Sequence, residues 1–337
     1  MRAFLLLAAV IFSVFLSLSV SATDWEEQEY FDSGSATEKI RVVSSTDTSV
    51  FKPIIQRFLA TNPRIAIEYL VAGSTGIYDV FRNTPDQFDV VISSAMDLQI
   101  KLVNDGLARS IEGLDHPVWA QWRQSLFGFT LEPAAIVVNK AAFAGLPIPG
   151  SRQEMIEVLR ENIDTFKGRI GTYDVRESGL GYLFATQDAR RSETYWRLME
   201  IMGSLDARVY CCSSEMLDDV ASGEIAISYN VLGSYAMDRS DIADKVEVIL
   251  PSEFPTTMMR TAFVANKAPN PNAATSFVRF LTSTEWSASG GSSLPALQNA
   301  SGNAQTSVIS LEPSLMIFLD RMKRSLFIKE WERAIIQ

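Results

Sequence analysis

Residues 40–62, with the sequence IRVVSSTDTSVFKPIIQRFLATN, decide the fold of this chain. The β-branched residues at the start of this stretch predict a strand. After a polar turn, apolar residues recur at the spacing of one helix face: Phe51, Ile54, Ile55, Phe58 and Leu59. A strand that passes through a short turn into a helix packed on the sheet is the repeating unit of α/β folds.

The polar turn of this stretch, Ser44 to Ser49, places six oxygen-bearing side chains at a helix N-terminus. Small anions bind at such a position. A single turn of this kind is more often only a helix cap and a solvated loop. The functional interpretation therefore depends on whether the pattern recurs.

The pattern does recur after two further predicted strands. Residues 65–71 lead into AGSTG at 72–76, and residues 88–92 lead into SSAMD at 93–97. Loops at the carboxyl ends of neighbouring strands share one rim of an open α/β sheet. We therefore expect one half of a ligand-binding crevice from six side chains: Ser45, Thr46, Ser74, Thr75, Ser93 and Ser94.

Composition and length bound the class of protein. Residues 1–22 have one basic residue, an apolar stretch and a small-residue ending, which predicts a cleaved signal peptide rather than a membrane anchor. Cleavage there would leave 315 residues with a formal net charge of −11, since only Arg2 is lost from a chain of −10. Residues 23–38 are predicted to be a flexible leader. The remaining length suits two domains, and the acidic balance argues against nucleic-acid binding.

The chain has two cysteines, and they are adjacent. Cys211 and Cys212 cannot join distant parts of the chain, so a packed core must supply the stability. In an oxidising compartment the pair can form a vicinal ring or remain a dithiol, while a buried or incidental pair is the simpler interpretation.

The second half of the chain offers a matching set of polar residues. Arg176, Ser178 and Gly179 follow a predicted strand and precede a helix, so a guanidinium and backbone N–H groups can meet one anion there. Tyr229 and Asn230 end a neighbouring strand. For Arg176 the alternative is an ion pair with a nearby carboxylate, and for Tyr229 it is ordinary packing. For Arg260 a structural salt bridge is the simpler interpretation.

Enzyme motifs are not evident. The sequence lacks a Gly-x-Ser-x-Gly elbow, a His-Glu-x-x-His helix, a phosphate-binding glycine loop and a metal-spaced Cys and His cluster. Its single histidine, His116, precedes a proline. We therefore expect a protein that is not an enzyme and needs neither cofactor nor metal.

An ordered set of segments resembles a known family. In chain order they are VVSSTDTSVFKPIIQRF, YLVAGST, FDVVISSAMD, EPAAIVVN, GRIGTYDVRESGLGY, EMLDDVASGEIAISYN, MMRTAFVANKAPNPNAATSFVRFL and LDRMKRSLFIKEW. This set resembles the periplasmic solute-binding proteins of ABC transporters with the type 2 fold, in the group that includes ferric-iron transport components.

The resemblance implies an α/β fold with two mixed-sheet lobes joined by two hinge strands. Residues 39–131 and 258–337 would form lobe one, to which the C-terminal segment returns, and residues 132–257 would form lobe two. The ligand would bind between the lobes, and the protein would be a periplasmic monomer that delivers it to a membrane permease.

The function remains open among three interpretations, which differ in the ligand or in the membrane partner. Iron-binding members of the family use adjacent tyrosines, whereas Tyr229 is followed here by Asn230 and the next tyrosine is Tyr235. A lining of Ser, Thr, Gly and Arg instead favours a small phosphorylated or carboxylated anion. The alternatives are a ferric-iron carrier and a periplasmic sensor that acts on a membrane histidine kinase.

Overall fold

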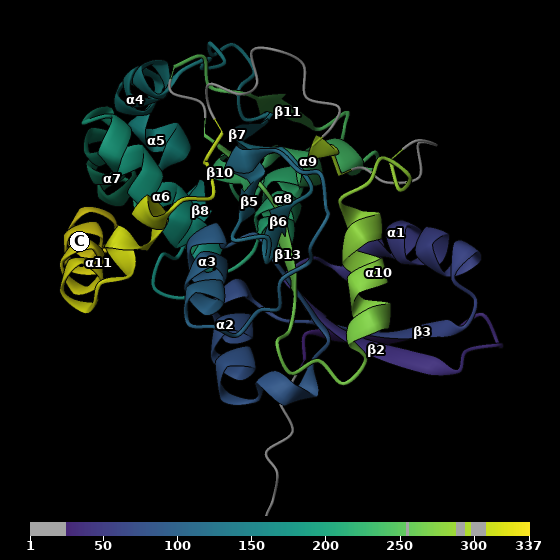
Figure 1. The fold of residues 1–337 in the computed structure, drawn as a ribbon. Coiled ribbons are helices and arrows are strands. Elements are labelled where there is room, and N and C mark those ends of the chain that lie inside the picture. The colour runs from purple at the N-terminus through teal and green to yellow at the C-terminus, as the bar shows by residue number, and fades with distance from the viewer. Residues whose placement is uncertain (1–24, 254–255, 288–293, 298–307) are drawn as a thin grey trace, which may run out of the picture.

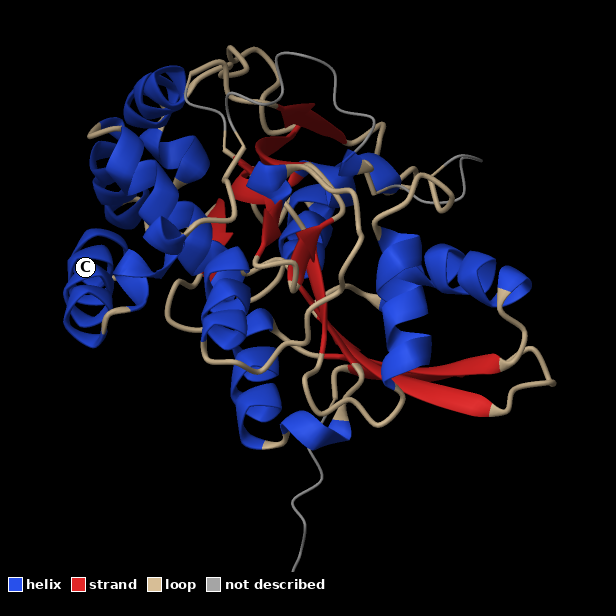
Figure 2. Cartoon of the chain, viewed as in Figure 1, coloured by secondary structure: helices blue, strands red, loops and turns tan. Residues whose placement is uncertain are grey.

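Two mixed β-sheets, each covered by helices, form the two lobes of the molecule (Figures 1 and 2). The computed structural model describes residues 25–253, 256–287, 294–297 and 308–337. The α/β, two-sheet architecture expected from the sequence is confirmed.

The first sheet has the strand order β1-β3-β2-β4-β13-β6-β5. β2 pairs in parallel with both β3 and β4, and β13 is antiparallel to β4. The strands are β1 (Glu27–Phe31), β2 (Glu38–Ser44), β3 (Ile65–Val71), β4 (Val90–Ser93), β5 (Gln121–Trp122), β6 (Leu126–Gly128) and β13 (Thr261–Val264).

Helix α1 (Thr48–Thr61) packs on this sheet through the stripe that the sequence predicts. Phe51, Ile54, Ile55, Phe58 and Leu59 are all buried. The other helical segments of this lobe are α2 (Ser74–Asn83), η1 (Pro85–Gln87), α3 (Met96–Asn104), η2 (Val118–Ala120) and α10 (Pro271–Leu281).

The second sheet has the order β11-β7-β10-β8-β9, with β12 paired to the start of β7. Its strands are β7 (Glu132–Asn139), β8 (Ile170–Tyr173), β9 (Arg208–Tyr210), β10 (Ile227–Leu232), β11 (Val246–Ile249) and β12 (Thr257–Met258). The helices around it are α4 (Arg152–Glu161), α5 (Ile163–Phe166), α6 (Gly179–Arg191), α7 (Thr194–Ser204), α8 (Ser213–Ser222) and α9 (Gly233–Asp238).

The segment expected to be a flexible leader, residues 23–38, contains strand β1 instead. β1 pairs antiparallel with β3 along the edge of the first sheet. Only Phe31 of this strand is buried, so its polar composition gave no strand signal. Backbone pairing with β3, a tertiary contact, holds the segment in place. The predicted signal peptide lies outside the described residues.

The C-terminal helix packs on the second lobe, whereas the family resemblance implied that residues 258–337 belong to lobe one. Helix α11 (Arg321–Ile335) contacts α7, and its Phe327 and Trp331 belong to the apolar core of the second lobe. The preceding η5 (Pro313–Leu319) contacts α3 of the first lobe. Close contact requires Gly203 in α7, because a Cβ there would lie 1.9 Å from the carbonyl oxygen of Ala334.

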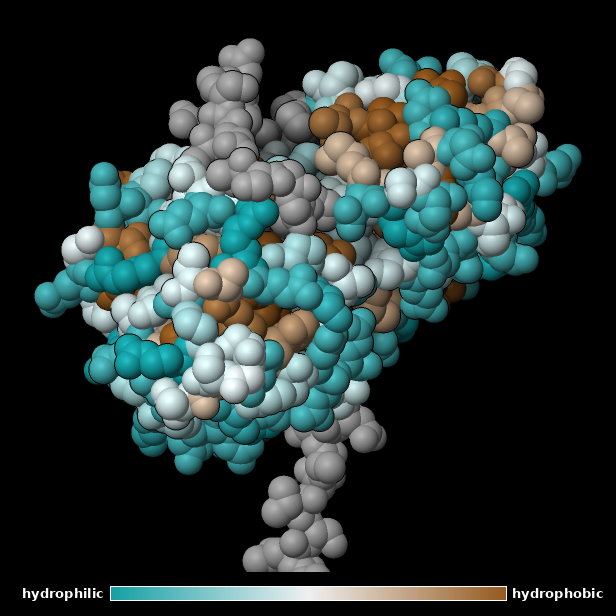
Figure 3. Space-filling model, turned by 90° about the vertical axis from the view of Figure 1, so that its right-hand side faces the viewer, coloured by the Kyte–Doolittle hydropathy of each residue, from teal (hydrophilic) through white to brown (hydrophobic). Residues whose placement is uncertain are grey.

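Within the described residues, the chain therefore crosses between the lobes at three places. The first crossing leads into β7, the second runs from β12 to β13, and the third leads from η5 to α11. The face in Figure 3 is covered mainly by hydrophilic residues, with apolar side chains in separate groups. Among the described residues, no helix is long and apolar enough to cross a membrane.

Candidate functional site

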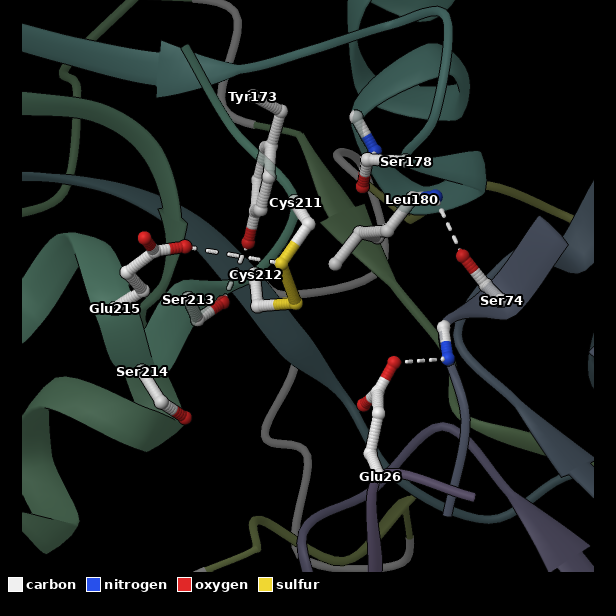
Figure 4. Close-up of a disulfide and its surroundings, with 12 residues drawn as sticks. Glu26, Ser74, Tyr173, Ser178, Leu180, Cys211, Cys212, Ser213, Ser214 and Glu215 are labelled. Atoms are coloured by element: carbon white, nitrogen blue, oxygen red, sulfur yellow. Dashed lines mark hydrogen bonds between the residues drawn. A yellow bond between two sulfur atoms is a disulfide. The ribbon is translucent and has the colours of Figure 1, made fainter. Parts of the chain in front are cut away.

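A small polar hollow lies between the two lobes. Its volume is about 60 Å³. The first lobe contributes Glu26, Ser45, Asp47, Ala72, Gly73, Ser74 and Ser94, and the second contributes Tyr173, Ser178, Leu180, Cys211, Cys212, Ser213, Ser214, Leu232 and Tyr235. Figure 4 shows much of this lining around the two cysteines.

Five helices of nine or more residues begin at or next to this hollow, and the short helix α9 follows Leu232 of its lining. Asp47, Gly73 and Ala95 precede the first turns of α1, α2 and α3 in the first lobe. Ser178 and Cys212 precede those of α6 and α8 in the second lobe. The first N–H groups of a helix lack partners within it and carry a partial positive charge. The helix N-termini therefore favour negative charge at the hollow, and the carboxylates of Glu26 and Asp47 in its lining already supply some.

Serine hydroxyls add adaptable hydrogen-bonding groups to the lining. Ser45 and Ser94 bond to each other, with 3.3 Å between their Oγ atoms, and the N–H of Ser94 also donates to Ser45 Oγ. Ser178 accepts a hydrogen bond from the N–H of Gly181 and so caps α6. Each hydroxyl can both donate and accept, so it can reorient toward a ligand.

The two lobes touch directly at the hollow. Ser214 of α8 donates a 2.6 Å hydrogen bond to Asp47, and Tyr235 donates a longer one of 3.4 Å to the same carboxylate. The N–H of Leu180 donates to Ser74 Oγ over 3.2 Å. These contacts join the lobes in a closed arrangement.

Two carboxylates next to the hollow bind helix N-termini. Glu26 accepts a 2.8 Å hydrogen bond from the N–H of Gly73, the residue before α2. Glu27 accepts one of 2.9 Å from the N–H of Thr48, the first residue of α1. Glu27 begins strand β1 and Glu26 directly precedes it, with its N–H bonded to the carbonyl of Val71, so the pairing of β1 with β3 positions both groups. The chain thus places its own anions on these two helices.

The adjacent cysteines form a disulfide that lines the hollow. Among the alternatives left open by the sequence, the structure has the vicinal ring. Tyr173 is buried beside it, and its hydroxyl hydrogen-bonds to Ser213. Burial raises the pKa of Tyr173 well above its usual range.

Four of the residues singled out in the sequence line the hollow: Ser45, Ser74, Ser94 and Ser178. Three others lie directly behind or beside it. Thr46 is fully buried, Ser93 Oγ accepts from the N–H of Ala95, and Gly179 packs against the first lobe. Thr75 faces a separate hollow between α2, α3 and the C-terminal segment.

Arg176 does not line the hollow. Its guanidinium binds Asp174 at 2.6 Å and reaches Glu332 of α11 at 3.5 Å. Burial by itself would raise the pKa of Asp174, but the hydrogen bonds and charge of Arg176 outweigh it and lower that pKa. The ion-pair alternative considered from the sequence is therefore the arrangement observed.

Tyr229 and Asn230 also lie away from the hollow, within the second lobe. Both donate hydrogen bonds to Asp188, which forms a buried ion pair with Arg152. Asn230 has a positive φ of 64° at a register shift in β10. This irregularity turns both side chains toward a buried polar network.

Sequence reasoning missed several residues of the lining. Asp47 lies in the quoted turn, but it was not among the residues expected in the crevice. Its side chain instead bonds to the opposite lobe and makes no cap bond to α1. Tyr173 and Tyr235 each lie near a strand end, which is a usable signal. Glu26 lies in a segment without any pattern and could not be found.

A buried ion pair connects the crossings to the hollow. Arg260, next to β13, binds Glu132 at the start of β7, and both side chains are fully buried. Arg260 also donates to Thr46 of the first lobe, and Ser234 of the second lobe donates to Glu132. The salt bridge expected for Arg260 is confirmed. The pair links both hinge segments to the rim.

A family model decides the class of this two-lobed protein. Residues 43–288 match the model of the bacterial extracellular solute-binding proteins. The chain belongs to this family. Among proteins with curated descriptions, none matches this chain in sequence.

Solved structures of solute-binding proteins have the same fold. The substrate-binding protein of an ABC transporter from Agrobacterium tumefaciens is 31% identical, with a TM-score of 0.84 over 92% of this chain and 98% of that one. AfuA from Actinobacillus pleuropneumoniae, solved with fructose-6-phosphate, is 15% identical, with a TM-score of 0.70 over 89% and 99%. Iron-bound HitA from Pseudomonas aeruginosa is 14% identical, with a TM-score of 0.65 over 88% and 99%.

These neighbours establish the expected family and its work with ABC transporters. They differ in what their titles say they bind, since one holds a sugar phosphate and another holds iron. Within the described ranges of this chain, no group of three or more His, Cys, Asp or Glu side chains is arranged to hold a metal ion.

Proposed function

We propose that this solute-binding protein captures a small phosphorylated or carboxylated anion in the interlobe hollow, in the periplasm, and delivers it to an ABC permease. Ser45, Ser74, Ser94 and Ser178 would contact the ligand. Closure of the lobes on the bound anion would create the form that the membrane partner recognises.

The observation that carries this proposal is the meeting of five helix N-termini at one serine-rich hollow. Two of the helices come from the second lobe and three from the first. An anion held between them would gain hydrogen bonds from both sides. Those contacts favour the closed state, because they are complete only when the lobes meet.

The carboxylate of Glu26 illustrates that the N-terminus of α2 can bind an anion, although it also adds negative charge to the lining. It accepts a hydrogen bond from the N–H of Gly73 at the start of α2, as a ligand's carboxylate or phosphate would. The lining contains two acidic side chains, Glu26 and Asp47, and neither Lys nor Arg nor His is among its residues. Backbone dipoles and hydroxyls would therefore hold the anion.

Ferric iron fits the described lining less well. Hard ferric ion favours anionic oxygen donors, and Tyr173 and Tyr235 are the phenols that line the hollow. Burial raises the pKa of both tyrosines well above the usual range. Each phenol would have to lose its proton against this shift before it could bind the metal.

The sensory alternative uses the same hollow and the same closure. In that case the closed protein would activate a membrane histidine kinase. Genes for a permease and an ATPase beside this one would support transport, whereas genes for a kinase and a response regulator would support sensing.

A thermal-shift screen of the mature protein tests the proposal. The panel is sugar phosphates, phosphonates, di- and tricarboxylates and ferric ion. A ligand at 100 times its dissociation constant should stabilise the fold by about 2.7 kcal/mol. Ser94→Ala and Ser178→Ala should reduce the shift caused by an anion, and Arg176→Ala, outside the hollow, should leave it unchanged. A shift with ferric ion alone, together with a tyrosinate-to-iron absorption band, would contradict the anion proposal.

A further inference from the structure

The disulfide occupies the link between an edge strand and a helix that reaches the opposite lobe. Cys211 and Cys212 directly follow β9 and precede α8. Cys212 is the residue before the first turn of α8, and both cysteines line the hollow. Cys211 is exposed and Cys212 is partly exposed, so a small thiol reagent can reach the sulfur atoms.

The first turn of α8 makes two polar contacts immediately after the disulfide. Ser213 bonds to the buried hydroxyl of Tyr173 in its own lobe. Ser214 donates to Asp47 in the other lobe over 2.6 Å. The position of Ser214 thus depends on the backbone at Cys212, since one residue separates them.

Asp47 is committed to this contact between the lobes. Although it precedes α1, its side chain makes no cap bond to that helix, and Glu27 binds the N–H of Thr48 instead. Its two carboxylate oxygens accept from Ser214 and from Tyr235, and both partners belong to the second lobe. Movement of α8 would therefore alter or break the contact at Asp47, directly before α1.

We propose that the Cys211–Cys212 disulfide positions the first turn of α8 for the contact between Ser214 and Asp47, so that its reduction weakens closure of the lobes. A ring closed through a single peptide unit restricts the backbone on both sides of that unit. Without the ring, the loop gains conformational freedom that the contact must then overcome. Cys211 and Cys212 are positioning residues in this account.

The reductant is a dithiol. One of its thiolates attacks a sulfur of the protein disulfide, breaks the S–S bond and releases the other protein sulfur as a thiolate. Its second thiolate then attacks the mixed disulfide and releases the remaining protein thiolate. Two electrons and two protons pass to the protein, which gains two thiols, and the dithiol becomes a cyclic disulfide. The link from closure to ligand capture rests on the proposed function, but the contact itself is testable without ligand.

Hydrogen exchange of the full mature chain, measured without ligand, provides the test. The protein is compared before and after treatment with dithiothreitol, and the redox state is checked by thiol alkylation and mass measurement. We expect residues 45–51 of the first lobe to exchange several-fold faster after reduction, together with residues 213–217. Ser214→Ala should exchange fast at 45–51 in both redox states, and Cys211→Ser/Cys212→Ser should not respond to dithiothreitol.

The exchange at residues 45–51 separates the two roles that the disulfide can have. A disulfide that only stabilises its own loop would alter exchange at 213–217 and leave 45–51 unchanged, which would overturn the proposal. Failure of the adjacent thiols to form a disulfide with oxidised glutathione would overturn it as well. The comparison of the native chain with and without dithiothreitol decides the matter even where a variant does not fold. No anion is involved, so a failed ligand screen would not affect the result.

Discussion

Ser214 donates a hydrogen bond to Asp47 across the interlobe hollow, over 2.6 Å, and so joins the first turn of α8 to the start of α1. Both residues occupy helix N-termini, where a carboxylate would ordinarily cap its own helix. Here the carboxylate of Asp47 is used between lobes. The closed arrangement therefore depends on polar contacts that also line the candidate site.

Ser214→Ala should shift the ligand-free protein toward a more open form. A hydrogen bond to a charged group contributes about 1.5–3 kcal/mol, and about 1.4 kcal/mol corresponds to a tenfold change in an equilibrium constant. Small-angle X-ray scattering should show a larger radius of gyration. Ser222→Ala, at the exposed end of the same helix, is the matched control. Equal radii for the two variants would mean that the contact does not hold the lobes together.

Gly179→Ala should hinder closure by steric contact. A Cβ at this position would lie 2.8 Å from Ser74 Oγ, 3.0 Å from Leu98 Cδ1 and 3.1 Å from Ala95 Cβ, and all three atoms belong to the first lobe. We expect weaker binding of any anion found in the thermal-shift screen, by about tenfold for a cost of about 1.4 kcal/mol.

The control for Gly179→Ala is Gly76→Ala in α2. A Cβ there would meet nothing nearer than Ala72 Cβ at 4.0 Å. Alanine is favoured over glycine in a helix by about 1 kcal/mol, so this variant should be as stable as the native chain or more stable. Unchanged affinity in Gly179→Ala would argue that the ligand binds without the closure seen here.

Glu132→Gln should destabilise the protein strongly, because it leaves the buried guanidinium of Arg260 without its charge partner. Removing one member of a buried ion pair costs about 3–5 kcal/mol. Urea denaturation measures the loss. The double variant Glu132→Gln/Arg260→Met should recover part of it, because no unpaired charge remains. A double variant as unstable as the sum of the two single variants would show that the pair is not coupled.

Asp97 should make the stability of the first lobe depend on pH. Its side chain is 2% exposed, and Oδ1 has no hydrogen-bond partner among the described residues. Burial raises the pKa of Asp97 from 3.8 to about 7, although the α3 backbone and the charge of Arg324 oppose the shift. Between these two values the folded chain binds more protons than the unfolded chain, so stability falls as the pH rises from about 4 to about 7.

The variant Asp97→Asn removes this titration. Its stability relative to the native chain should increase as the pH rises through this window and level off above pH 7. One pKa unit corresponds to about 1.4 kcal/mol, so a gain above about 1 kcal/mol at pH 8 is expected. Urea denaturation at pH 5 and pH 8 measures it. A difference that is the same at both pH values would contradict the raised pKa.

Glu26→Gln should increase affinity for an anion by about threefold to tenfold, as expected from removing about 1 kcal/mol of charge repulsion. The glutamine carbonyl can still accept from the N–H of Gly73, so the start of α2 stays satisfied. The gain should shrink in high salt. Glu29→Gln changes the same charge in β1, where Glu29 pairs with Lys52 away from the hollow, and should have little effect. Equal anion affinities for Glu26→Gln and Glu29→Gln would show that the charge of Glu26 does not affect ligand binding.

The sequence predicted the features that follow from repeated strand, turn and helix patterns. It missed those that depend on contacts between distant residues. The strand, turn and helix pattern at residues 40–62 determined the first lobe, and the serine turns placed Ser45, Ser74 and Ser94 correctly at one rim. Arg176 was expected opposite them, in the second lobe, because it follows a predicted strand and precedes a predicted helix. Its side chain turned to Asp174, and that preference is invisible in a strand-end pattern.

The other departures have the same origin. Strand β1 exists through its pairing with β3, because its own residues are polar and mainly exposed. Helix α11 shows a helical pattern, but the pattern does not say which lobe receives it. Gly203 provides the close approach, and a glycine inside a helix gives no hint of its partner.

The passage from η5 to α11 changes the mechanics of opening. With only the two crossings at β7 and at β12 to β13, the lobes could rotate about a hinge formed by these neighbouring strands. The third connection, from η5 to α11, contacts α3 of the first lobe at one end and α7 of the second lobe at the other. It therefore restricts how far the lobes can separate. Tyr182 of α6 donates a 2.6 Å hydrogen bond to the carbonyl of Phe318 and so ties η5 to the second lobe as well. A wide separation of the lobes would therefore have to break the contact of η5 with α3 or that of α11 with α7.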